Sequence, residues 1–224
     1  MPEMSASRGQ KVKRTKPIQT QVDRALDALR EESWYVAENH LLKALTASRG
    51  RDDWEGMIEI IEGLRQCRRG IRRQALVRGS VRICNDGTTE TMDISTGRYL
   101  VEPPLVGADA RKLIQAGRDK QVAIAVVCRE PLTQTGLIPI VAIAPGTTIR
   151  VQIEPPANKK KPTTAWFKGA MESLGEAALE SIDPSRSVDR RIDALMGTID
   201  AIPDHEELYV ALSEACCEAH ELGE

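Results

Sequence analysis

Apolar residues recur with a helical period in the first third of the chain. Val22, Ala25, Leu26 and Leu29 follow the i, i+3, i+4, i+7 spacing of a helix that buries one face. The same spacing recurs twice before the pattern changes near residue 79. It predicts three helices within residues 18–78. Caps are expected near Thr20 and Asp52, the second helix follows Ser33, and the third extends to Leu76.

The first and third of these helices superpose at a shift of 35 residues, which places Val22 on Met57, Leu26 on Ile61 and Leu29 on Leu64. Helix-hairpin repeats have periods of about 34 residues. The segments AENHLLKAL (37–45) and DWEGMIEIIEGL (53–64) resemble tetratricopeptide-type repeats, and the likeness covers residues 20–76. The resemblance implies a groove that binds a peptide or protein. An antiparallel helical bundle would have the same apolar spacing.

The middle of the chain changes to a period of two and to β-branched residues. The pattern predicts strands at 81–84, 98–101, 122–128, 137–144 and 147–153, and a helix at 107–120. A strand, a helix and a second strand form a parallel crossover unit, whereas Pro145-Gly146 indicates a hairpin. Residues 79–155 are therefore predicted to form a small α/β domain with a mixed sheet.

A segment rich in proline and lysine, residues 156–163, is the predicted linker to the C-terminal part. Helical spacing then returns three times in residues 164–224. Asp204 can cap the last of the three helices. One and a half repeats cannot bury a core alone, so we expect residues 164–224 to pack on residues 18–78.

Composition indicates a globular chain: 41% of the 224 residues are hydrophobic, 29% are charged and 3% are aromatic. The net charge of −2 conceals an uneven distribution. Residues 1–80 carry 16 basic against 11 acidic side chains, residues 81–163 carry 11 against 8, and residues 164–224 carry 4 against 14. The basic, aperiodic residues 1–17 are predicted to be a flexible arm.

The densest basic cluster lies at the end of the third predicted helix. Its arginines are spaced three and four apart, so they form a stripe if the helix continues through Gly70. The stripe consists of Arg65, Arg68, Arg69, Arg72 and Arg73. These arginines could bind phosphates of a nucleic acid, but no aromatic residue accompanies them to stack on bases. The alternative is pairing with the acidic C-terminal helices, within the chain or across a dimer.

Motifs of catalysis are absent from the sequence. No GxSxG, HExxH, GxxxxGK[ST] or GxGxxG occurs. Cys216 and His220 share a helical face, but two ligands do not make a metal site, so no metal, cofactor or catalytic residue is predicted. An enzyme of unrecognised type would need a deep pocket beside Asp109, Arg129 and Glu130.

The five cysteines are odd in number, lack CxxC spacing and favour a reducing compartment. No apolar run approaches the length of a membrane span. The sequence thus predicts a cytoplasmic α+β protein with tetratricopeptide-like hairpins, a small mixed sheet with one crossover helix and a three-helix C-terminal segment. The predicted function is a non-enzymatic interaction or scaffold protein with a protein or peptide partner or a second copy of itself. The alternatives are a nucleic-acid-binding accessory protein and an enzyme.

Overall fold

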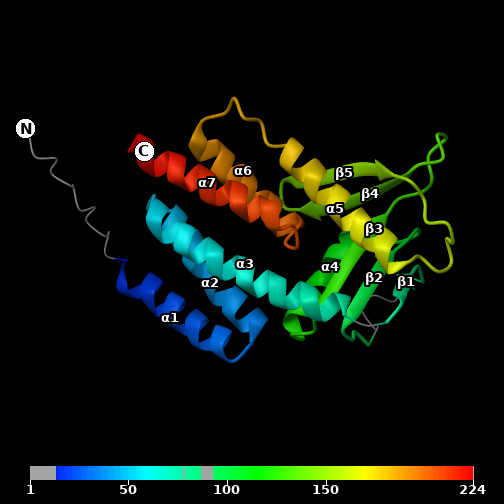
Figure 1. Ribbon diagram of the computed structural model, residues 1–224, viewed down its shortest axis with the longest axis horizontal. Helices are drawn as coiled ribbons and strands as arrows, with labels where there is room; N and C mark the ends of the chain where they lie inside the picture. The colour runs from blue at the N-terminus through cyan, green and yellow to red at the C-terminus, as the bar shows by residue number, and fades with distance from the viewer. Residues whose placement is uncertain (1–13, 78, 87–92, 224) are drawn as a thin grey trace, which may run out of the picture.

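The computed structural model describes residues 14–77, 79–86 and 93–223, which form helices around one mixed sheet (Figure 1). The helices are α1 (Lys16–Arg30), α2 (Trp34–Arg49), α3 (Trp54–Leu76), α4 (Gly107–Asp119), α5 (Thr164–Glu180), α6 (Val188–Ala201) and α7 (Glu206–Leu222). The strands are β1 (Val81–Cys84), β2 (Gly97–Val101), β3 (Ile124–Arg129), β4 (Ile138–Ala144) and β5 (Thr147–Ile153). The predicted α+β class is confirmed.

Helix α1 begins at Lys16, inside the segment 1–17 that the sequence predicts to be a flexible arm. Pro17 lies in the first turn, where its missing N–H leaves no helical hydrogen bond unmade. The predicted start near Thr20 was therefore too late. Residues 1–13 of the predicted arm lie outside the described residues.

The buried face of α1 differs from the predicted face by one position. Leu26 is 44% exposed, although the periodicity placed it inward. The helix is buried instead through smaller side chains that let α2 approach closely, namely Ile18, Val22, Ala25 and Ala28.

Two predicted helix caps are displaced by one residue. Asp53 rather than Asp52 caps α3, and its carboxylate accepts a hydrogen bond from the Gly56 N–H at 3.0 Å. Asp52 has a positive φ of 53° and belongs to the preceding turn. His205 rather than Asp204 occupies the N-cap position of α7, so Asp204 lies in the turn between α6 and α7.

The sheet has the order β1-β2-β3-β4-β5, with β1, β2 and β3 parallel and β4 and β5 antiparallel to their neighbours. Strands β4 and β5 pair along their full length. The ladder between β3 and β4 contains two residue pairs, Cys128 with Val141 and Arg129 with Ile140. The first half of β3 and the second half of β4 therefore diverge, and the sheet is split between them.

The two faces of the sheet are covered by different helices. Helix α4 packs on one face, where it buries Tyr99, Ile124 and Cys128. Helices α3 and α5 pack on the other face, where Leu100, Ala125 and Val127 join the core of the helical segments. The sheet side chains alternate between these two cores because successive residues of a strand point to opposite faces.

The C-terminal helices return to the N-terminal ones. Helix α7 packs along α3 and α6, as Figure 1 shows, while α5 lies across β5. Residues 156–163, the predicted linker, join β5 to α5, with Pro156 and Pro162 buried. The large core contains side chains from α1 to α3, the sheet and α5 to α7, so the helical segments and the sheet share one interior.

We predict that Gly70→Ala destabilises the protein although alanine is the better helix former. A Cβ at Gly70 would lie 2.5 Å from a ring carbon of Trp34, which is itself buried between helices. We expect a loss of about 1–3 kcal/mol in the free energy of unfolding, measured with urea. Gly169→Ala in α5 is the control, because nothing lies within 4 Å of its added Cβ; it should stabilise the protein by about 0.5–1 kcal/mol. Equal effects of the two substitutions would contradict the packing at Trp34.

Candidate functional site

The predicted arginine stripe lies along α3 and faces the start of α7. Arg65 donates a hydrogen bond to Glu206 at 2.8 Å, and Arg69 pairs with the same carboxylate. These bonds lower the pKa of Glu206 to about 2, Arg69 having the larger effect. Glu206 thus bridges two arginines of α3. These two arginines pair with an acidic C-terminal helix of the same chain, one of the arrangements considered for the stripe.

The far end of the stripe is more open. Arg72 donates to the backbone carbonyl of Asp204 at 3.2 Å and lies 3.5 Å from a carboxylate oxygen of Glu172. Arg73 is exposed and forms no ion pair with any residue that the structure describes. The structure thus brings four of the five stripe arginines to acidic or carbonyl groups of the C-terminal segment and leaves Arg73 apart from them.

Arg68 is the buried member of the stripe. Its side chain is 7% exposed and pairs with Glu38 of α2, which is 5% exposed. A second carboxylate, that of Asp204, lies 3.7 Å away. Burial raises the pKa of Asp204, an effect that Arg68 opposes. One guanidinium therefore links α2, α3 and the turn before α7.

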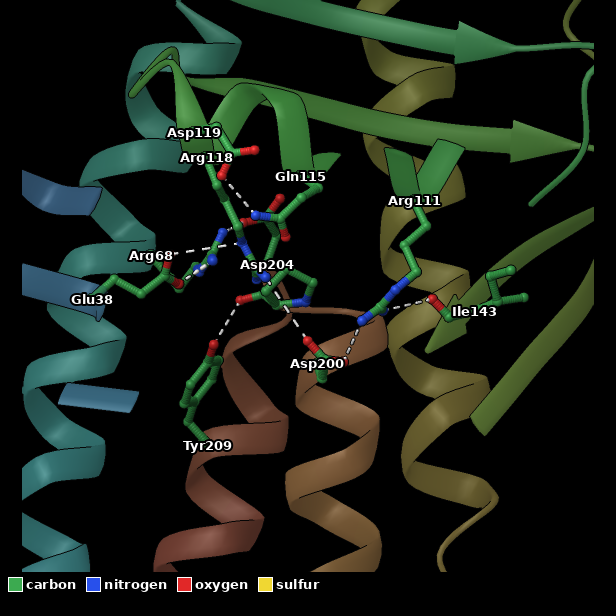
Figure 2. Close-up of polar contacts among 11 residues, drawn as sticks. Glu38, Arg68, Arg111, Gln115, Arg118, Asp119, Ile143, Asp200, Asp204 and Tyr209 are labelled. Carbon is green, nitrogen blue, oxygen red and sulfur yellow. Dashed lines mark hydrogen bonds and ion pairs between the residues drawn. The ribbon is translucent and has the colours of Figure 1, made fainter. Parts of the chain in front are cut away.

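Helix α4 adds two more arginines to this centre (Figure 2). Arg111 bonds to Asp200 of α6 at 2.8 Å and to the carbonyl of Ile143 at 3.1 Å. Arg118 extends from α4 towards Arg68 and lies 3.8 Å from Asp200. We call this group the central ion-pair cluster: Glu38, Arg68, Arg111, Arg118, Asp200 and Asp204.

A cavity lies beside the cluster, at the split between β3 and β4. Its space between the side chains measures about 630 Å³, including the part open to solvent. The apolar part of the wall comes from α4, the diverging strands and α5: Ile114, Ile124, Val126, Ala142, Met171 and Leu174.

The polar part of the wall comes from α2 to α5 and from the turn before α7, whose Ile202 and Pro203 also line the cavity. It includes Tyr35, Arg68, Arg72, Arg118, Glu172, Asp204 and His205. Burial raises the pKa of Tyr35 to about 12, so its hydroxyl stays protonated and donates to the Val122 carbonyl at 3.0 Å. His205 is 4% exposed, and its Nε2 has no hydrogen-bond partner among the described residues.

The other candidate groups from the sequence lie elsewhere. Arg129 pairs with Glu102 at 2.7 Å, and Glu130 pairs with Arg150 at 2.7 Å, so the two neighbours do not pair with each other. Asp109 accepts a hydrogen bond from the Val106 N–H at 3.0 Å and holds the start of α4. None of Asp109, Arg129 and Glu130 lines the cavity.

The histidine and cysteines of α7 do not assemble into a metal centre. Cys216 is fully buried, whereas His220 is largely exposed and lies 3.6 Å from Glu55. Within residues 14–77, 79–86 and 93–223, no three histidine, cysteine or acidic side chains are grouped as metal ligands would be. In the same part of the chain, no helix is long and apolar enough to cross a membrane.

Comparison of the chain with models of protein families, with curated proteins and with solved structures gave no match.

The cavity residues missed by sequence reasoning come from separate segments. Tyr35, Arg118 and His205 belong to α2, α4 and the cap of α7, and no local motif joins them. One signal was present in the sequence: Arg118 lies one turn after Ile114 on α4, so a cation shares a helical face with an apolar residue.

Removing Glu38 should be far more costly than removing an exposed acidic partner. Glu38→Gln leaves the buried Arg68 without its close carboxylate, and we expect a loss of about 3–5 kcal/mol in the free energy of unfolding. Glu130→Gln, at the more exposed pair with Arg150, should cost about 1 kcal/mol or less. Urea denaturation followed by circular dichroism measures both variants. Losses within about 1 kcal/mol of each other would show that the Arg68 pair is no more important than the surface pair.

The Glu206 bridge should make stability depend on pH in acid. Its pKa is about 2 in the folded chain against an ordinary value of 4.5, so its contribution is present above pH 4.5 and disappears as the pH falls towards 2. Glu206→Gln should therefore lower stability by about 1 kcal/mol at pH 7 and by progressively less below pH 4.5. Glu207→Gln, at the exposed neighbouring position, is the control. A pH-independent difference between Glu206→Gln and the wild type would exclude the proposed linkage.

Proposed function

We propose that the protein binds a small organic molecule in the cavity between β3 and β4. The observation that carries the proposal is the mixed wall of this cavity. Apolar side chains from two strands and two helices face a set of arginine, acidic and histidine side chains. Such a combination provides hydrophobic contact for the body of a ligand and polar groups that orient it.

The shape of the sheet supports a cavity of this kind. Close packing normally fills protein interiors, and cavities larger than a water molecule are few. Here the divergence of β3 and β4 removes backbone pairing beyond Cys128 and Val141, and the side chains of α4 and α5 leave space at that point. A ligand bound there would contact all three segments of the chain, because each supplies part of the wall.

The interaction and nucleic-acid hypotheses remain predictions with less support from the geometry. A peptide groove on α3 would have to share that helix with α7, which packs along it. A nucleic acid would have to displace Glu206 from Arg65 and Arg69. The described surface offers apolar side chains such as Leu26, Val77 and Leu132 at separate places along the chain, which favours neither hypothesis.

We also propose a cytoplasmic location. Cys67, Cys128 and Cys216 form no disulfide with any described residue and are buried, and Cys84 is buried as well. Burial raises the pKa of Cys67, Cys128 and Cys216 to about 12, so these thiols are poor nucleophiles near neutral pH. A reducing compartment suits a chain whose thiols serve as core side chains.

A neutral fluorescent probe tests whether the cavity accepts ligands. N-phenyl-1-naphthylamine brightens in apolar surroundings, and we expect saturable binding to the full-length protein. Ala142→Leu places a larger side chain in the cavity wall and should weaken binding about tenfold or more. Ala144→Leu is the matched control, two residues along the same strand and outside the cavity lining.

Melting temperatures of both variants should be determined beside the titrations. If the two variants melt alike and only Ala142→Leu loses the probe, the site is the cavity. Equal loss in both variants, or no saturable binding by the wild type, would exclude the proposed function.

A further inference from the structure

We propose that the ligand is an organic monoanion, a carboxylate on an apolar body, and that Arg118 binds its carboxylate. This inference rests on the proposed function, since it concerns the chemistry of the ligand in the same cavity. Arg118 is the specificity-determining residue in this proposal, and the apolar wall formed by β3, β4 and α5 receives the remainder of the molecule.

Arg118 is a partly buried cation for which the described residues supply no hydrogen-bond acceptor. Its side chain is only 20% exposed, yet it donates to no side-chain or backbone acceptor of the described residues. Its nearest acidic oxygens belong to Glu38 at 3.9 Å and Asp200 at 3.8 Å. Both distances exceed those of a hydrogen bond. A guanidinium offers five N–H donors. The Nε of Arg118 is buried without a hydrogen-bond partner among the described residues, whereas buried donors are normally satisfied.

The two nearby carboxylates are already engaged by other arginines. Glu38 pairs closely with Arg68, and Asp200 bonds to Arg111 at 2.8 Å. Arg118 is therefore the third arginine beside two occupied carboxylates, as Figure 2 shows. A carboxylate supplied from the cavity could accept two parallel hydrogen bonds from this guanidinium, the geometry that arginine favours.

The charges around the cavity favour one negative charge on the ligand. Among the lining residues, three arginines face two acidic side chains, Glu172 and Asp204. Arg72 already contacts Glu172 and the Asp204 carbonyl. The other two arginines of the wall already pair with carboxylates, Arg68 with Glu38 and Arg72 with Glu172. A second negative charge on the ligand would therefore be repelled by the acidic side chains, whereas a monoanion matches Arg118 alone.

The apolar wall of the cavity indicates that the ligand has a hydrocarbon part besides its carboxylate. Ile114 lies one turn before Arg118 on α4, and both line the cavity. Val126 and Ala142 continue the apolar surface across the split in the sheet. A ligand whose carboxylate lies on Arg118 would thus extend its hydrocarbon part along α4 towards the strands.

Competition among three probes of similar length tests the ligand class. Octanoate, 1-octanol and octylamine differ in charge but share the same chain, and each is titrated against bound N-phenyl-1-naphthylamine at pH 7 below its micelle concentration. We expect octanoate to compete about tenfold or more better than 1-octanol, and octylamine to compete least.

Substitution of Arg118 assigns the preference to one side chain. Arg118→Met should remove the advantage of octanoate over 1-octanol. The readout is the ratio of the two competition constants, in which any change in the binding of the probe itself cancels. The fold should persist, because Glu38 and Asp200 keep their closer arginines. Lys120→Met, an exposed charge removal at the end of α4, is the control and should leave the octanoate preference intact.

The outcomes separate the two proposals. If N-phenyl-1-naphthylamine binds in the cavity but octanoate and 1-octanol compete equally, the anion proposal is wrong and the cavity proposal stands. An octanoate preference that persists in Arg118→Met also overturns the role of Arg118. If no probe binds to the wild type, both proposals fail.

Discussion

The buried ion pair between Arg68 and Glu38 is the constraint on which the rest of the architecture depends. A charge in the interior is tolerable only where an opposite charge and hydrogen bonds replace the lost water. Glu38 meets this requirement from α2, and Asp204 adds a second carboxylate from the turn before α7. The helices around this pair therefore have little freedom to shift, and the C-terminal segment must return to α3 for the arrangement to close.

The split in the sheet shows a similar requirement, because backbone groups that lose their pairing between strands need other hydrogen-bond partners. Where β3 and β4 diverge, side chains supply hydrogen bonds near the strands: Tyr35 bonds to the carbonyl of Val122, and Arg111 bonds to the carbonyl of Ile143. Tyr35 comes from α2 and Arg111 from α4. Helix side chains thus bond to the backbone at the divergence, and the space left between the strands becomes the cavity. The central ion-pair cluster and the cavity are two results of one packing arrangement.

Periodicity was sufficient to predict the helices, the strands and the α+β class, because each burial pattern is local. Periodicity failed at Leu26, which is exposed although the spacing placed it inward. It also placed the caps of α3 and α7 one residue too early. The arginine stripe was visible as a spacing on one helix, but its partners Asp204 and Glu206 lie more than 130 residues away in the sequence. The cavity could not be predicted, since its wall is assembled from segments that meet only in the folded chain and depends on how far β3 and β4 diverge.

The return of α7 to α3 has a consequence for the order of events during synthesis. The arginines of α3 leave the ribosome long before Asp204 and Glu206, which follow them by more than 130 residues. Until those residues emerge, α3 exposes both its cations and the apolar side chains that α7 later covers. We therefore expect the core around α3 to form only after α7 has been synthesised. A chain whose translation stops before α7 should be prone to aggregation or chaperone binding.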